Sequence, residues 1–195
     1  MAAFIRRVFG AGLALVGIGV LASCSFFPST PSPFHDDSEQ KAGVQMQHIA
    51  DAVKHHDAAA LKKLFSPRAV NEATDLDSGL KYFLSVIPSG KLTWETRGTG
   101  LTSDTEGFKQ ATELYGNYRV SVNGEQYSLH FAYFSVDDFD PHNVGIYALG
   151  VAPRADYGYT ASGARTPFAE WFSQFDISDT THTATGNPGV YVPQK

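Results

Sequence analysis

Cysteine is almost absent from this chain of 195 residues, in which Cys24 is the only one. A single cysteine excludes an intramolecular disulfide and any metal site built on paired cysteines. Long apolar runs are absent too, because residues 8–21 are uncharged but rich in glycine and shorter than the roughly 20 apolar residues of a membrane-spanning helix. The HExxH, GxSxG and P-loop motifs are also missing, so the sequence predicts no metal, no cofactor and no easily read catalytic mechanism.

The N-terminal segment has the three parts of a secretory signal. Arg6-Arg7 is basic, residues 8–21 are apolar, and small residues follow up to position 23. Leu21-Ala22-Ser23-Cys24 resembles the bacterial lipobox, which implies that Cys24 is lipidated on sulfur, for example with palmitate, and becomes the new N-terminus. The alternative is an incidental cysteine near a conventional cleavage site, which would leave a lone thiol in an oxidising compartment. We therefore predict residues 1–23 as a lipoprotein signal peptide and an extracytoplasmic protein anchored to the bacterial cell membrane through Cys24.

Positive charge is also in short supply. The chain has 15 Lys and Arg against 20 Asp and Glu, and removal of residues 1–23 takes away Arg6 and Arg7, leaving 13 basic residues and a net charge of −7. An acidic balance disfavours nucleic acid and anionic lipid as partners. The membrane contact is therefore expected to be the lipid on Cys24 alone.

The remaining chain divides into a spacer and one domain. Residues 24–38 are rich in Pro, Ser and Thr and predict a semi-rigid spacer. Residues 39–195 predict a single domain, since a chain of 195 residues with 43% hydrophobic and 13% aromatic residues has enough apolar material for one core. Helical periodicity covers residues 38–56, 57–65, 66–73 and 74–87, and strand periodicity follows at 91–97, 110–136 and 143–151, with a loop at 98–107. A helix start at Thr166-Pro167 and a last strand at 189–192 complete the prediction, and helices grouped before strands indicate an α+β domain with an antiparallel sheet.

A hairpin about Asn123-Gly124 is the strongest local signal, because a type I′ turn needs two residues that tolerate positive φ. With these two residues as the loop, Val120 lies opposite Tyr127, Tyr118 opposite Leu129, and Asn117 opposite His130. One face of the hairpin is then aromatic and aliphatic, and the other is mostly polar near the turn. Which of the two faces the helices is not set by the sequence.

Several segments resemble a bacterial lipoprotein family of unknown function, domain of unknown function type 5104, in the nuclear transport factor 2-like superfamily. The resemblance rests on the order of these segments: residues 49–53, 60–66, 75–79, 143–147 and 188–193. It implies a cone-shaped, cystatin-like roll of N-terminal helices on a curved antiparallel sheet, with residues 153–187 as a less certain elaboration. It implies no catalytic residues.

Two polar positions are candidates for chemistry. Asp137 stands in an acidic segment with Asp138, Asp140 and His142 that fails as a calcium loop, because Asn143 and Leu149 occupy the positions that need Gly and Glu, and a turn explains it better. His130 is a candidate general base, because isomerases of the resembled fold use an Asp or His inside the cone, but its place on the polar face favours a surface or interface histidine.

An aromatic set offers a candidate pocket, although a sheet packed on helices must present such a face as core in any case. Its members are Trp94, Tyr118, Tyr127, Phe131 and Tyr133. The leading hypothesis is a non-catalytic binding or interaction domain with an unknown ligand. The alternatives are a small isomerase- or dehydratase-type enzyme with a polar residue inside the cone, and a structural role through a homodimer by the sheet face.

Overall fold

The computed structural model describes residues 37–154, 158, 162–175 and 188–193. The predicted signal peptide, Cys24 and the spacer up to residue 36 lie outside these residues. Within them, no helix has the length and apolar composition needed to cross a membrane.

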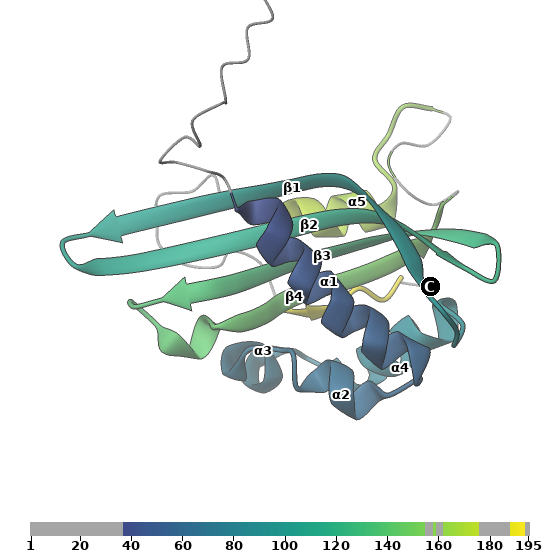
Figure 1. Ribbon diagram of the computed structural model, residues 1–195, viewed down its shortest axis with the longest axis horizontal. Coiled ribbons are helices and arrows are strands. Elements are labelled where there is room, and N and C mark those ends of the chain that lie inside the picture. Colours follow the sequence, from purple (N-terminus) through teal and green to yellow (C-terminus); the bar gives the residue numbers. More distant parts are fainter. Residues whose placement is uncertain (1–36, 155–157, 159–161, 176–187, 194–195) are drawn as a thin grey trace, which may run out of the picture. The chain divides into compact units, whose positions relative to one another are not determined.

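Helices come first and strands follow, as predicted (Figure 1). The helices are α1 (Ser38–Lys54), α2 (Ala58–Lys62), α3 (Pro67–Glu72) and α4 (Leu76–Val86). The strands are β1 (Thr93–Glu106), β2 (Lys109–Val122), β3 (Glu125–Asp137), β4 (Gly145–Pro153) and β5 (Gly189–Val190), with α5 (Pro167–Phe172) and the 3₁₀ segments η1 (Pro141–Asn143) and η3 (Ser173–Phe175) between them. The curved, open sheet has the order β1-β2-β3-β4-β5, so the α+β class is confirmed and the architecture is consistent with a nuclear transport factor 2-like roll.

The predicted hairpin is confirmed in register. Val120 pairs with Tyr127, Tyr118 with Leu129, and Asn117 with His130. Asn123 and Gly124 have φ angles of 54° and 87°, as a type I′ turn requires. The local turn chemistry therefore fixes which residues share each face of β2 and β3.

Two strand predictions are corrected by the structure. The predicted loop at residues 98–107 is wrong, because β1 continues through Gly98 and Gly100 to Glu106. A Cβ at Gly100 would lie 2.0 Å from the ring of Tyr115, so this aromatic side chain on β2 covers the glycine and compensates for its weak strand propensity. The sheet is also not wholly antiparallel, because β5 pairs parallel with β4.

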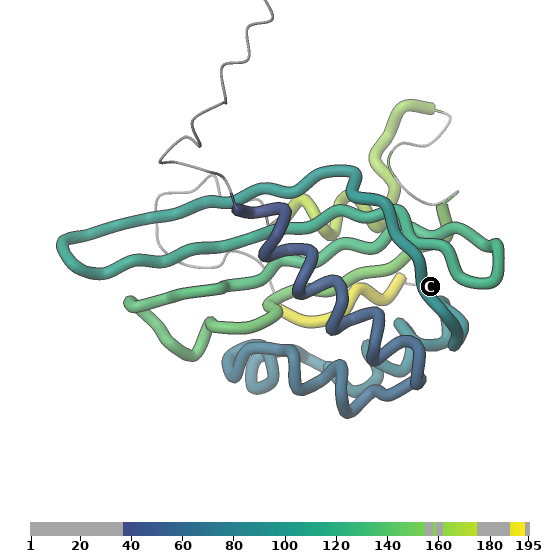
Figure 2. Tube along the Cα trace, in the orientation of Figure 1, coloured from purple at the N-terminus to yellow at the C-terminus, as the bar shows by residue number. Residues whose placement is uncertain are grey.

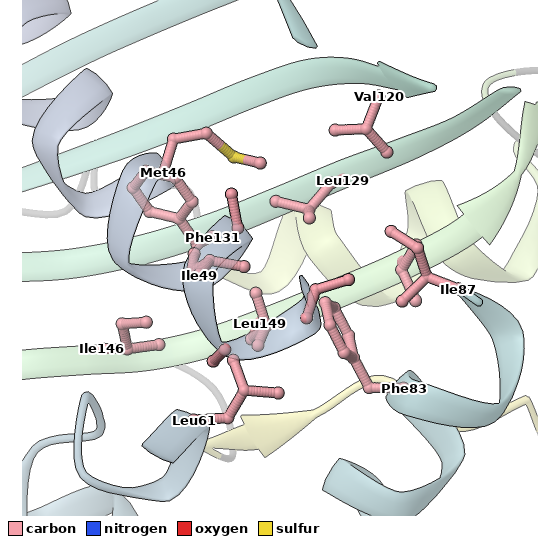
Figure 3. Packing of buried hydrophobic residues seen from close by; sticks show 14 of the residues in the cluster. Met46, Ile49, Leu61, Phe83, Ile87, Val120, Leu129, Phe131, Ile146 and Leu149 are labelled. Atoms are coloured by element: carbon pink, nitrogen blue, oxygen red, sulfur yellow. The ribbon is translucent and has the colours of Figure 1, made fainter. Parts of the chain in front are cut away.

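The core lies between the helices and one face of the sheet, which α1 crosses (Figures 1 and 2). In Figure 3, Met46 and Ile49 of α1 and Phe83 of α4 lie among side chains of β2, β3 and β4. All three residues are 0% exposed. The aromatic and aliphatic face of the hairpin is therefore the face that packs against the helices.

Side-chain caps start the short helices where the sequence predicts them. Asp57, Ser66 and Thr166 each accept a hydrogen bond from a backbone N–H in the first turn, and Pro67 and Pro167 occupy the first position of α3 and α5. At α4 the cap is Asp75, which accepts the Ser78 N–H. These caps define the ends of helices that are too short to be stable alone.

We expect Ser66→Ala to lower the free energy of unfolding by about 1–2 kcal/mol. The Ser66 hydroxyl accepts the Ala69 N–H at 3.1 Å in a buried position, so its loss leaves that donor without its partner. Urea denaturation measures the change. Ser85→Ala is the control, because its hydroxyl donates to the Tyr82 carbonyl on an exposed surface. Equal losses in the two variants would contradict the role of the Ser66 cap.

Candidate functional site

The candidate aromatic pocket residues lie on the helix side of the sheet. Tyr118, Tyr127 and Phe131 are buried in the main core, and Trp94 and Tyr133 are half-buried against it. Tyr118 stacks on Phe131 with 5.8 Å between ring centroids. Burial, with a smaller contribution from Glu39, raises the pKa of Tyr118 to about 12, so its phenol stays neutral. These rings are therefore part of the packing of the core.

His130 lies on the opposite face of the sheet. It is only 6% exposed, and its ring meets Phe168 and Phe172 edge-on at centroid distances of 5.1 and 4.8 Å. Burial lowers the pKa of His130 to about 3. Of the two interpretations, the surface histidine is wrong, because α5 covers this face, and the interface histidine stays a prediction. His130 points away from the helix side of the roll.

Asp137 organises the turn after β3. Its Oδ1 accepts the backbone N–H groups of Phe139 and Asp140 at 3.0 and 2.8 Å, and its Oδ2 accepts the Asn143 side-chain amide at 2.8 Å. Asp140 in turn caps η1 by accepting the His142 N–H. Both Asp137 oxygens are thus engaged in shaping the predicted turn. In the part of the chain that the structure describes, no group of three or more His, Cys, Asp and Glu side chains could hold a metal ion.

An aromatic cluster under α5 forms a second core on the outer face of the sheet. Phe168 and Trp171 contact Tyr191 with ring centroids 5.0 and 5.5 Å apart, and Trp171 also contacts Phe172. Ala132, Phe134, Tyr147 and Ala148 supply the sheet side. The apolar spacing of residues 168–175 predicts the helix but carries no information on where it docks.

A pocket of about 220 Å³ opens beside this cluster. It lies between the α3–α4 connection and β5, and we call it the Asp75 pocket. The lining residues are Ala73, Thr74, Asp75, Leu76, Trp171, Pro188, Gly189, Val190 and Val192. α4 and β5 pack closely beside the pocket, because a Cβ at Gly79 would lie only 2.8 Å from Cβ of Val190.

Comparison with known proteins identifies the family. The family described as Domain of unknown function (DUF5104) matches residues 48–155, which is more than half of the chain. The chain belongs to the DUF5104 family. No curated protein matches the chain.

The DUF5104 match covers part of the Asp75 pocket. It includes Asp75 and Leu76, whereas Trp171 and residues 188–192 lie beyond it. Sequence reasoning missed this pocket, although residues 75–79 and 188–193 are two of the segments on which the resemblance rests. Their contact joins positions more than a hundred residues apart, and nothing local in the DUF5104 sequence signals it.

The Asp75 pocket is negatively charged and partly apolar. Asp75 Oδ1 accepts the Ser78 N–H at 3.0 Å, and hydrogen bonds from the side chain and backbone of Ser78 lower the pKa of this carboxyl. Among the described residues that line the pocket, none is Lys, Arg or His. These residues can bind a small molecule through one fixed carboxylate and an apolar wall.

Proposed function

We propose that this DUF5104 chain is a lipid-anchored lipoprotein of the bacterial envelope whose domain binds a ligand or partner without catalysing a reaction. The anchor is supported by the tripartite signal in residues 1–23 and by the lipobox-like Leu21-Ala22-Ser23-Cys24. The predicted Pro-rich spacer, residues 24–38, would hold the domain away from the bilayer. The family itself is one of unknown function, so the binding role depends on the site.

The single observation that carries the anchor is the position of Cys24. The only cysteine of the chain follows Leu21-Ala22-Ser23 directly. A diacylated cysteine buries many methylene groups, each worth about 0.8 kcal/mol, and this holds a protein at a membrane without a spanning helix. The lipid thus accounts for membrane attachment of an acidic domain.

We expect Cys24→Ala to abolish incorporation of radiolabelled palmitate. We also expect the variant to lose the membrane attachment that depends on the lipid, and so to leave the membrane fraction. The reason is that the variant lacks the only thiol that could be acylated. Palmitate labelling followed by fractionation of bacterial cells measures both effects. Ser25→Ala is the control, because it changes the neighbouring residue and keeps the cysteine. Label in the Cys24→Ala protein would show that the lipobox interpretation is wrong.

A binding role is favoured over an isomerase or dehydratase by the positions of the two candidate residues. The enzyme hypothesis needs His130 or Asp137 on the helix side of the roll. His130 instead lies under α5, and Asp137 holds the turn after β3. The Asp75 pocket offers space for a ligand, and we propose it as the binding site.

We also propose that any homodimer uses the outer face of the sheet over β1 and β2. Over β3 and β4 this face is occupied by α5 and its aromatic cluster. Over β1 and β2, Tyr115 is 41% exposed, and Asn117 and Arg119 are half-buried. This is the part of the face that is open to a second copy.

A further inference from the structure

We propose that the Asp75 pocket binds the ammonium group of an organic amine that carries a short apolar body. The inference rests on the binding role proposed above and is independent of the lipid anchor. Charge, wall chemistry and size each bear on the class of ligand.

The charge of the pocket favours a cation. Among the described residues that line the pocket, Asp75 is the one that carries a charge. The start of α4 would by itself attract an anion, because the helix dipole is positive there. Asp75 already caps this end, and Asp77 stands in the first turn. The negative charges of these two carboxylates offset the positive end of the helix dipole.

Neighbouring cations leave the Asp75 carboxylate accessible. Lys62 forms its ion pair with Asp77 at 2.7 Å. Lys81 makes only the smallest contribution to the lowered pKa of Asp75, behind the hydrogen bonds from Ser78 and the opposing effect of burial. The Asp75 side chain is exposed, and it accepts hydrogen bonds from the backbone and the side chain of Ser78. A carboxylate has about four acceptor sites, so it can still accept a hydrogen bond from an ammonium group.

The wall of the pocket suits an apolar body and an aromatic contact to the cation. Leu76, Val190 and Val192 supply aliphatic surface beside the indole of Trp171. The electrons of an aromatic face attract an ammonium group. Trp171 is held by Tyr191 at 5.5 Å and Phe172 at 6.2 Å, so this wall is already formed without a ligand.

The size of the pocket limits the ligand. A volume of about 220 Å³ is below the range of roughly 300–1,000 Å³ typical of sites for drug-sized molecules. A single ring or a short chain with one ammonium group fits this space. The same chemistry occurs in a free amine and in the lysine side chain of a polypeptide, and the experiment separates these sources.

The test is a ¹H–¹⁵N titration of the purified full-length chain with three probes of similar shape. These are 2-phenylethylammonium, the anion 3-phenylpropionate and the neutral 2-phenylethanol. We expect the ammonium probe alone to shift the indole N–H signal of Trp171 in the millimolar range. Trp94, at the margin of the main core, serves as the internal reference and is assigned with Trp94→Phe.

Asp75→Asn isolates the charge. Asn is as good an N-cap as Asp, so α4 keeps its cap while the carboxylate is lost. We expect Kd for 2-phenylethylammonium to rise about 5-fold, as for the loss of one exposed ion pair with an aromatic neighbour. Asp51→Asn is the control, because it removes an exposed carboxylate of α1 that lies outside the pocket lining, and it is expected to leave Kd within 2-fold.

The outcomes are separable. Equal binding of the anion or the alcohol, equal effects of the two Asn variants, or an unmoved Trp171 signal would overturn the amine assignment. If the anion or the alcohol binds at Trp171, the proposed binding role of the pocket still holds. If no probe binds, neither the binding role of the pocket nor the amine assignment is supported. With the assignment upheld, tighter binding of N-acetyl-lysine methylamide than of 2-phenylethylammonium identifies a polypeptide lysine as the source, and weaker binding identifies a free amine.

Discussion

The free energy of unfolding of the domain is expected to fall as the pH decreases from 7 to 4. We expect this decrease to be smaller by about 3 kcal/mol in a variant that lacks His130. A histidine in an unfolded chain titrates near 6.5, whereas burial lowers the pKa of His130 in the folded domain to about 3. Between these values the unfolded state binds the proton and the folded state does not. The free energy of unfolding therefore falls with decreasing pH, by about 1.4 kcal/mol per unit below pH 6.5.

The physical cause is the docking of α5. Phe168 and Phe172 enclose the imidazole ring and exclude the water that would solvate an imidazolium. Desolvation by burial is therefore the cause of the lowered pKa of His130. Acid should therefore loosen α5 from β3 before it affects the helix-side core.

Guanidinium denaturation at pH 7, 6, 5 and 4 measures the slope in the wild type and in His130→Gln. His130→Gln loses packing at every pH, so the comparison uses the slope and not the absolute stability. His142→Gln is the matched control, because the His142 side chain is 74% exposed and forms its contact with Asp140 at the surface. If His130→Gln keeps the wild-type slope, other groups cause the acid sensitivity and the interpretation of His130 is wrong.

Local signals predicted the fold well. Asn123-Gly124 sets the turn and, through the alternation of β2 and β3, every pair from Val122 opposite Glu125 back to Asn117 opposite His130. Caps such as Ser66 act within one helical turn, so they too are visible in the sequence. These features depend on neighbours in the chain and need no knowledge of the tertiary structure.

Tertiary docking accounts for what the sequence did not predict. In the extension of β1, Gly100 is covered by the ring of Tyr115, which belongs to the neighbouring strand β2. The burial of His130 depends on α5, which follows it by more than 35 residues. The Asp75 pocket depends on β5 packing on α4. Each of these three features requires a contact between different elements of the chain. The hydrophobic pattern of an element does not determine where it docks on another.

Gly145→Ala is expected to lower the free energy of unfolding by about 3–5 kcal/mol. Gly145 has a φ angle of +129°, which residues with an L side chain rarely adopt. Holding alanine in this backbone conformation costs of order 1–3 kcal/mol. The added Cβ would also lie 2.6 Å from N and 2.8 Å from Cα of Ser66. These are backbone atoms, so the clash cannot be relieved by a side-chain rotation.

The clash falls where the helices are joined to the sheet. The Ser66 N–H donates to the Ile146 carbonyl at 2.9 Å, and the Ile146 N–H donates to the Leu64 carbonyl at 2.8 Å. Moving the two segments apart would break both bonds and leave buried backbone groups without partners, at about 1–3 kcal/mol each. The close approach that only glycine permits at position 145 therefore anchors the α2–α3 junction to β4.

Gly124→Ala separates the clash from the backbone strain. Gly124 also has a positive φ angle, +87°, but an added Cβ there would meet nothing within 4 Å. It should cost about 1 kcal/mol from the backbone conformation alone. Urea denaturation of both variants gives the difference, which measures the contact between Gly145 and Ser66. Equal losses would show that the close approach contributes nothing beyond the φ angle, and that the α2–α3 junction can shift away from β4 at no cost.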